Sequence, residues 1–160
     1  MMPAHPPATV LEPHGLDEGA MQGLFALAVR LYSHQLYTQS ARVMQFLLRH
    51  EPARPQYQRA LGKALHASGQ HEEALQAYAR AVKLGMPDAD VHFYIAQCLV
   101  YTHRREAAQQ ALQRCLNLAR QQPQKLAGLI ERADLLLTRL QQLDRKATAG
   151  LRPALGPTSP

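Results

Sequence analysis

The sequence predicts an all-α fold, a solenoid of helix-turn-helix units, and one repeat period is the main observation behind it. Ala28, Gly62 and Ala96 follow one another at a constant spacing of 34 residues, each inside the same pattern of apolar residues. A small residue is needed where two helices cross closely, because the side chains at the contact set the distance between the helix axes. A second small residue recurs on the second helix of each unit, and a Pro lies close to the end of each unit.

The period of 34 residues is that of tetratricopeptide repeats. Gly69 stands at the turn of the second unit, where the first has Gln35 and the third has His103. An unrelated helical bundle with a chance period is the alternative, but units that agree in register argue against it. We expect three tandem repeats, at about residues 21–54, 55–88 and 89–122.

The segments on both sides of the repeats differ from them. Residues 1–16 are rich in Pro and contain no Lys or Arg, so we expect a flexible N-terminal arm. Residues 123–146 carry apolar side chains at intervals of three and four, which predicts one further helix. This helix would cap the last repeat, although its stripe also suits the pairing of two chains. The predicted repeat domain spans residues 17–146, and residues 147–160 are expected to be a disordered tail.

Composition narrows the class of protein. The 160 residues, of which 46% are hydrophobic, suffice for one domain with a core. No apolar run is long enough to span a membrane, and the N-terminus lacks the pattern of a secretory signal. Cys98 and Cys115 fall at core positions of a repeat, so we expect small buried residues in a reducing compartment. A disulfide between them is the alternative.

The chain is basic, with 18 Lys and Arg against 12 Asp and Glu and a formal net charge of +6. A basic surface can bind nucleic acid or an acidic partner. The basic residues are spread over helix B, the second helix of each repeat, and its ends. We therefore favour a solvated convex surface over a nucleic-acid-binding one.

We find no group of residues typical of catalysis, so we expect neither enzyme activity nor a cofactor. Among eight His residues, the nearest pair, His66 and His71, flanks a turn. No Cys or second pair accompanies it at the usual ligand spacing of a metal site, so no metal site is expected. Cys98 has no neighbouring cationic residue in the sequence that would activate its thiol.

One stripe of helix A, the first helix of each repeat, should face the concave side of the solenoid. It is apolar in the outer repeats and basic in the middle one, which predicts a ligand for the groove. Cover by the N-terminal arm or by a second chain is the alternative. The stripe consists of Gln22, Phe25, Val29 and Tyr32, then Gln56, Arg59, Lys63 and His66, then Asp90, Phe93, Gln97 and Val100.

The stripe lacks the residues with which other repeat domains bind the acidic C-termini of cytosolic heat-shock proteins. Phe25 and Val29 occupy the decisive places in the first unit, and Asp90 and Tyr94 occupy those in the third. An extended apolar peptide, held by side-chain pockets and backbone hydrogen bonds, is therefore the expected ligand.

Residues 88–100, with the sequence DADVHFYIAQCLV, resemble the third-repeat signature of the class II chaperones of bacterial type III secretion. His92 and Tyr94 depart from that signature, and members of the family are commonly acidic. The residues that match it are Phe93, Ala96, Cys98 and Leu99.

The resemblance implies a chaperone of the bacterial cytoplasm that binds hydrophobic translocator proteins and keeps them soluble and unassembled before export. Such chaperones hold an extended Pro-x-Leu-x-x-Pro-like segment of the translocator in the concave groove and often form homodimers. The alternative is an adaptor that links folded partners, and a further idea is that Pro153 to Pro157 fill the groove. Matched by position, the implied groove residues are Phe25, Val29, Tyr32, Arg59, Lys63, His66, Phe93 and Gln97.

Overall fold

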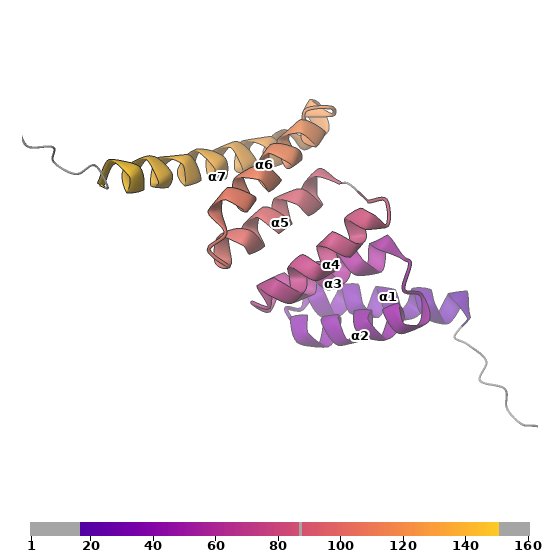
Figure 1. Ribbon diagram of the computed structural model, residues 1–160. Coiled ribbons are helices and arrows are strands. Elements are labelled where there is room, and N and C mark those ends of the chain that lie inside the picture. Colours follow the sequence, from indigo (N-terminus) through magenta and orange to yellow (C-terminus); the bar gives the residue numbers. More distant parts are fainter. Residues whose placement is uncertain (1–16, 87, 151–160) are drawn as a thin grey trace, which may run out of the picture.

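The computed structural model describes residues 17–86 and 88–150, and all regular secondary structure within them is helical. The helices stack in chain order, with α1 and α2 at one end and the long α7 at the other (Figure 1). They are α1 (Glu18–Ser33), α2 (Tyr37–His50), α3 (Pro55–Ala67), α4 (His71–Lys83), α5 (Ala89–Tyr101), α6 (Arg105–Ala119) and α7 (Pro123–Gly150).

The first six helices form three pairs, and each pair occupies one predicted repeat. Within a repeat, α1 packs on α2, α3 on α4 and α5 on α6. Each second helix also packs against the first helix of the next pair, and α7 packs against α6. The predicted all-α solenoid of three tetratricopeptide repeats followed by a C-terminal helix is therefore confirmed.

The middle repeat shows why a small residue is needed where the two helices of a unit cross. Gly62 on α3 faces the ring of Tyr78 on α4, and a Cβ atom at position 62 would lie 2.7 Å from the ring atom Cε1. Tyr78 is fully buried, so its ring cannot turn away into solvent. In the outer repeats the same two positions hold Ala28 with Met44 and Ala96 with Leu112.

The turns inside the three repeats share one backbone conformation. Gln35, Gly69 and His103 have φ values of 62°, 81° and 60°, which is the left-handed region. After each of them, an amide N–H donates to the carbonyl five residues earlier, at 2.9, 2.9 and 2.8 Å. This is a common way to end a helix, and Gly is the residue that adopts it without steric cost. The recurrence of the turn confirms the register read from the sequence.

Two clusters of buried side chains meet at α5. Val91 and Cys98 belong to the cluster built by the first two repeats. Phe93 and Leu99 belong to the cluster shared with α6 and α7. Cys98 and Cys115 are both buried and both free, in agreement with the core positions expected for them.

The last helix is longer than predicted. It continues to Gly150, so residues 147–150 belong to α7 and not to the expected tail. Two of these residues are Ala, the strongest helix former, and the Thr148 hydroxyl donates to the Asp144 carbonyl at 3.0 Å. The helix is interrupted once, at Leu126, whose φ and ψ are −115° and 19°.

This helix covers the last repeat, as a capping helix should. Residues of α7 that are buried in the cluster shared with α6 are Leu129, Ala133, Leu137 and Leu140. Leu143, which the sequence pattern had placed on the same stripe, is 47% exposed. α7 has 28 residues against 15 in α6, and its last turns run past the neighbouring helix (Figure 1).

Predictions for the arm of residues 1–16 and for the segment Pro153 to Pro157 lie outside the described residues. Within residues 17–86 and 88–150, no helix combines the length and apolar character needed to cross a membrane. The basic residues of the second helices and their ends are exposed, as a solvated surface requires. They are Arg42, Arg49, Arg80, Lys83, Arg104, Arg105, Arg114 and Arg120.

Candidate functional site

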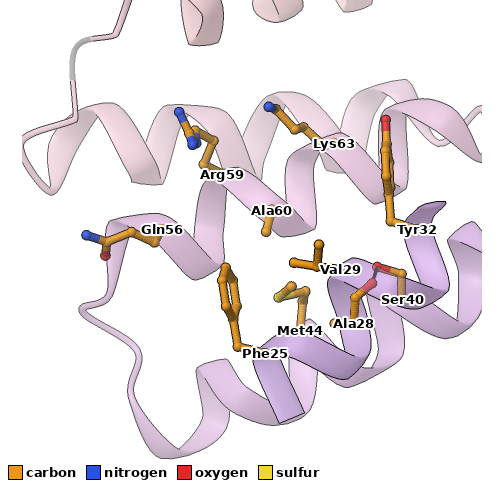
Figure 2. A pocket seen from close by; sticks show the side chains of 10 residues that line it. All are labelled: Phe25, Ala28, Val29, Tyr32, Ser40, Met44, Gln56, Arg59, Ala60 and Lys63. Carbon is orange, nitrogen blue, oxygen red and sulfur yellow. Dashed lines mark hydrogen bonds between the residues drawn. The ribbon is translucent and has the colours of Figure 1, made fainter. Parts of the chain in front are cut away.

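A cavity of about 410 Å³ lies between the first and second repeats. Helices α1 and α3 form its two walls, and α2 contributes to its floor (Figure 2). This volume is within the usual range of ligand-binding clefts. The lining residues are Phe25, Ala28, Val29 and Tyr32 from α1, Ser40 and Met44 from α2, and Gln56, Arg59, Ala60 and Lys63 from α3.

The floor of the cavity is rigid because it belongs to the core. Met44 is 1% exposed, and the Ser40 hydroxyl donates a hydrogen bond of 2.8 Å to the carbonyl of Ala28. This bond joins α1 to α2 directly below the cavity. At one side, the ring of Phe25 packs against that of Tyr57, with centroids 5.3 Å apart. The floor is therefore set before any ligand arrives.

The rim of the cavity is more exposed and partly apolar. Val29 is 48% exposed and Tyr32 is 37% exposed, although both lie next to buried residues of α1. The Tyr32 ring contacts that of Tyr37 edge to face, at a centroid distance of 5.2 Å. Partial burial raises the pKa of the Tyr32 hydroxyl, so this group is a neutral hydrogen-bond donor at physiological pH. Half-exposed apolar groups beside a cavity are typical of a binding surface.

The basic residues on the α3 side are paired rather than free. Arg59 Nη1 lies 3.2 Å from Asp88 Oδ2 and 3.5 Å from Asp90 Oδ2. Lys63 Nζ lies 3.7 Å from Asp90 Oδ2 and 5.3 Å from the centroid of the Tyr94 ring. The acidic residues come from the start of α5, in the next repeat. The middle repeat thus offers hydrogen-bond donors whose charge is largely balanced.

The structure brings together five of the eight residues that the sequence assigned to the groove. Phe25, Val29, Tyr32, Arg59 and Lys63 all line the cavity. The other three, His66, Phe93 and Gln97, lie outside it.

Phe93 differs most from its expected role. It is only 5% exposed, and the guanidinium carbon of Arg132 on α7 lies 5.2 Å from its ring centroid. The C-terminal helix therefore covers this part of the stripe. The sequence pattern of one repeat contains no information about the path of α7, which explains the error.

Gln56 belongs to the predicted stripe, and the other four lining residues were not predicted. Ala28, Ser40, Met44 and Ala60 are small or flexible, and they leave space where a larger side chain would fill the cavity. The sequence pattern assigns Ala28 only to the helix crossing. A small residue at a helix crossing also leaves space next to the concave surface. The positions of the small residues could therefore have predicted this part of the cavity.

Two family models match the sequence. The model described as tetratricopeptide repeat matches residues 65–133. The model described as bacterial transcriptional activator domain matches residues 7–86, which is half of the chain. The chain therefore contains tetratricopeptide repeats and, by the match over residues 7–86, belongs to the bacterial transcriptional activator domain family. Within the residues that the structure describes, the second match covers α1 to α4. Both models therefore match helix pairs of the repeats. No curated protein sequence matches the chain at a significant level.

Solved structures of type III secretion translocator chaperones share the fold of this tetratricopeptide-repeat protein. PcrH, from Pseudomonas aeruginosa, was solved with the chaperone-binding region of PopD. It is 22% identical in sequence, with a TM-score of 0.77, and the match covers 83% of this chain and 99% of that chain. SycD from Yersinia enterocolitica was solved with a peptide of the translocator YopD; it has 20% identity and a TM-score of 0.75, over 80% and 97%. An alternative dimer of SycD has 20% identity and a TM-score of 0.75, over 80% and 96%. The resemblance seen in the sequence therefore extends to the fold.

Proposed function

We propose that this chain is a cytoplasmic chaperone that binds an extended segment of a hydrophobic type III secretion translocator and keeps it soluble before export. The observation that carries the proposal is the apolar cavity between α1 and α3, with the half-exposed Val29 and Tyr32 at its rim. The solved structures that share the fold support it, since PcrH and SycD were each solved with part of a translocator.

Two kinds of side chain in the lining, apolar and hydrogen-bonding, bind different parts of an extended peptide. Apolar side chains of the peptide enter the cavity, where Phe25, Val29 and Met44 surround them. Gln56, Arg59 and Lys63 lie on the α3 wall and donate hydrogen bonds to the peptide backbone. Main-chain hydrogen bonds with pockets for alternate side chains are the usual way in which extended peptides are recognised. Such binding needs no chemical step, so we propose no enzyme activity.

We propose two groups of residues for the client-binding groove. Phe25, Val29, Tyr32, Arg59 and Lys63 contact the translocator segment directly. His66 and Gln97 line its continuation towards the third repeat, whereas Phe93 is shielded by α7 and takes part only indirectly.

The chaperone is also proposed to form a homodimer. Three apolar side chains of the first repeat, Leu27, Leu36 and Phe46, are 43%, 42% and 37% exposed and lie outside the cavity. Exposed apolar groups on one repeat suit an interface with a second chain. Light scattering of the purified chain at several concentrations tests this part of the proposal separately.

The central test is a calorimetric titration of a short Pro-x-Leu-x-x-Pro peptide into the wild-type chain and into Val29→Asp. Position 29 is 48% exposed, so Asp is tolerated in the free protein, but a bound peptide would bury its charge. We expect saturable binding to the wild type and an affinity at least about tenfold lower in the variant. The matched control is Leu135→Asp, since Leu135 is a 54% exposed apolar residue on α7, away from the cavity.

Binding that Val29→Asp and Leu135→Asp weaken equally would contradict a site in the cavity. An absence of heat with the wild type would favour the adaptor function, in which folded partners bind the convex surface. A translocator fragment that stays soluble only in the presence of the wild-type chain would then be the remaining evidence for a chaperone.

A further inference from the structure

Three helices from two repeats converge beside the end of α3. His66 lies in the last turn of α3, His71 is the first residue of α4, and Cys98 lies on α5. His66 Nδ1 is 3.2 Å from Cys98 Sγ. One ligand atom from each of these three side chains lies within 4.8 Å of the other two. Among the residues that the structure describes, no other group of His, Cys, Asp and Glu side chains comes together in this way.

The spacing of these atoms is close to that around a tetrahedral metal ion. With Zn–S and Zn–N bonds of about 2.3 and 2.0–2.1 Å, the sulfur and nitrogen ligands of one zinc ion are about 3.5 Å apart. The observed His66–Cys98 distance of 3.2 Å is near that value. The ligand atom of His71 lies within 4.8 Å of the other two, so this ring has to move towards them when an ion binds. A five-residue spacing across a turn is unusual for a His pair, but the two rings lie close together, with centroids 5.2 Å apart and an angle of 59° between their planes.

The His71 ring is held in place but lacks a hydrogen-bond partner. Tyr101 stacks on it, with centroids 4.2 Å apart and an angle of 4° between the planes. Its Nδ1 atom is buried, and no partner for it occurs within residues 17–86 and 88–150. A buried polar atom without a partner is uncommon in a native protein and calls for an explanation. A bound ion in contact with the ring would provide one.

The chemistry of the three side chains decides which cation they can hold. A cation that coordinates sulfur displaces the thiol proton, which leaves to solvent, and it gains a thiolate ligand. Sulfur and imidazole ligands together select zinc or copper rather than magnesium or calcium.

We propose that His66, His71 and Cys98 form a transition-metal site that takes Zn²⁺, with the fourth coordination position left for water. The ion would tie α3, α4 and α5 together and so fix the second repeat against the third. The site lies outside the cavity between α1 and α3, and His66 is the one residue that it shares with the proposed continuation of the groove. The metal site does not depend on the proposed chaperone function.

Cobalt(II) is the probe that tests the proposal on the full chain, because its absorption reports both thiolate ligation and tetrahedral geometry. The metal-stripped protein is titrated with Co²⁺, and Zn²⁺ is then added to displace it. We expect one ion per chain, a thiolate-to-cobalt charge-transfer band, and loss of the band on addition of Zn²⁺. Cys98→Ser should abolish the band, whereas Cys115→Ser should keep it, since Cys115 is an equally buried thiol away from the site.

A second variant keeps the proposal testable if Cys98→Ser does not fold. His71→Gln changes a partly exposed side chain at the start of α4, and circular dichroism verifies that the helices persist. We expect it to weaken Co²⁺ binding at least about tenfold, because even the loss of a group that only orients a metal ligand costs about 10–100-fold. Zn²⁺ should raise the melting temperature of the wild type more than that of either site variant.

Three results would overturn the proposal: no stoichiometric binding of Co²⁺ to the wild type, binding without the charge-transfer band, or a band that survives in Cys98→Ser. Equal affinity in the wild type and His71→Gln would remove His71 from the site. Peptide binding is measured on the same samples, so a failure of the metal site is distinguishable from a failure of the client groove.

Discussion

The junction between the first and second repeats and the junction between the second and third use the same positions of helix A, but only the first is open. Between α1 and α3, Phe25 and Val29 border a cavity of about 410 Å³. Between α3 and α5, Arg59 and Lys63 are paired with Asp90, and Phe93 is buried. The backbone geometry of a repeat is thus shared, while the residues at the stripe decide whether a junction leaves a cavity or closes on itself.

The difference also assigns separate tasks to the two junctions. The open one suits recognition because its α1 wall is apolar, its α3 wall carries hydrogen-bond donors and its floor belongs to the core. The closed one holds the stack together through ion pairs, aromatic contacts and the cluster of His66, His71 and Cys98. Helix α3 borders both junctions, so a change in its position should affect recognition and cohesion together.

The largest effect is expected for Gly62→Leu, which displaces α3 and therefore disturbs both junctions. The new side chain would overlap the buried ring of Tyr78, and overpacking of this kind costs about 1–3 kcal/mol of unfolding free energy. Urea denaturation measures the loss. Gly128→Leu is the control, because no heavy atom lies within 4 Å of a Cβ there and helix propensity favours Leu. An unchanged midpoint in Gly62→Leu would show that the repeat register, and the groove with it, is wrong.

A smaller effect is expected at the turns, which lie outside both junctions. The left-handed conformation costs Gln35 and His103 about 1–2 kcal/mol each, and the greater freedom of unfolded Gly offsets part of this. Gln35→Gly and His103→Gly should each raise the unfolding free energy by about 0.5–1 kcal/mol. Gly69→Gln should lower it by a similar amount. Peptide affinity should not change in any of the three, and a parallel change would contradict the separation of turns from junctions.

Asp90→Asn should open the closed junction at little cost to stability. Its ion pairs with Arg59 and Lys63 are partly exposed, and such pairs contribute about 0.2–1 kcal/mol. The loss should disappear in about 1 M salt, where the Debye length is short. Arg59 and Lys63, no longer paired with residue 90, should also bind a peptide with acidic flanks more tightly. Asp134→Asn breaks the Arg120 pair between α6 and α7 and should leave that binding unchanged.

The smallest effect is a dependence of stability on pH that arises at the closed junction and at α5. Burial lowers the pKa of His66 and of His92 below the usual value of about 6.5. The unfolded chain therefore binds more protons than the folded one below that pH, and stability falls as the pH decreases through about 6.5 towards the lowered pKa values. Urea midpoints on both sides of this range measure the effect. The double variant His66→Gln, His92→Gln should show a weaker dependence of stability on pH. An unaltered slope would show that other groups bind these protons.

The sequence was sufficient for the solenoid because each repeat encodes its own fold. The spacing of Ala28, Gly62 and Ala96 placed the crossings, and the structure then showed the same turn at Gln35, Gly69 and His103. Five residues that line the cavity followed from this register, since they lie on helices whose neighbours belong to the same pattern.

Features that depend on contacts between repeats were not accessible in the same way. Phe93 was misplaced because α7, which covers it, has no counterpart in the repeat pattern. The approach of Cys98 to His66 was missed because a linear search for ligand spacing does not compare neighbouring repeats. The pairing of Arg59 with Asp90 arises likewise between one helix A and the next.

The match between Gly62 and Tyr78 has a consequence for how such a chain can evolve and be engineered. Helices of different repeats are not interchangeable parts, because a bulky ring on one helix requires a residue without a side chain on its companion. Moving α4 into the third unit would set a tyrosine against Ala96, and moving α6 into the second would leave an empty space beside Gly62. Recombination that involves the middle repeat is therefore tolerated only when it exchanges the whole pair, and the module inherited there is the helix pair rather than the single helix.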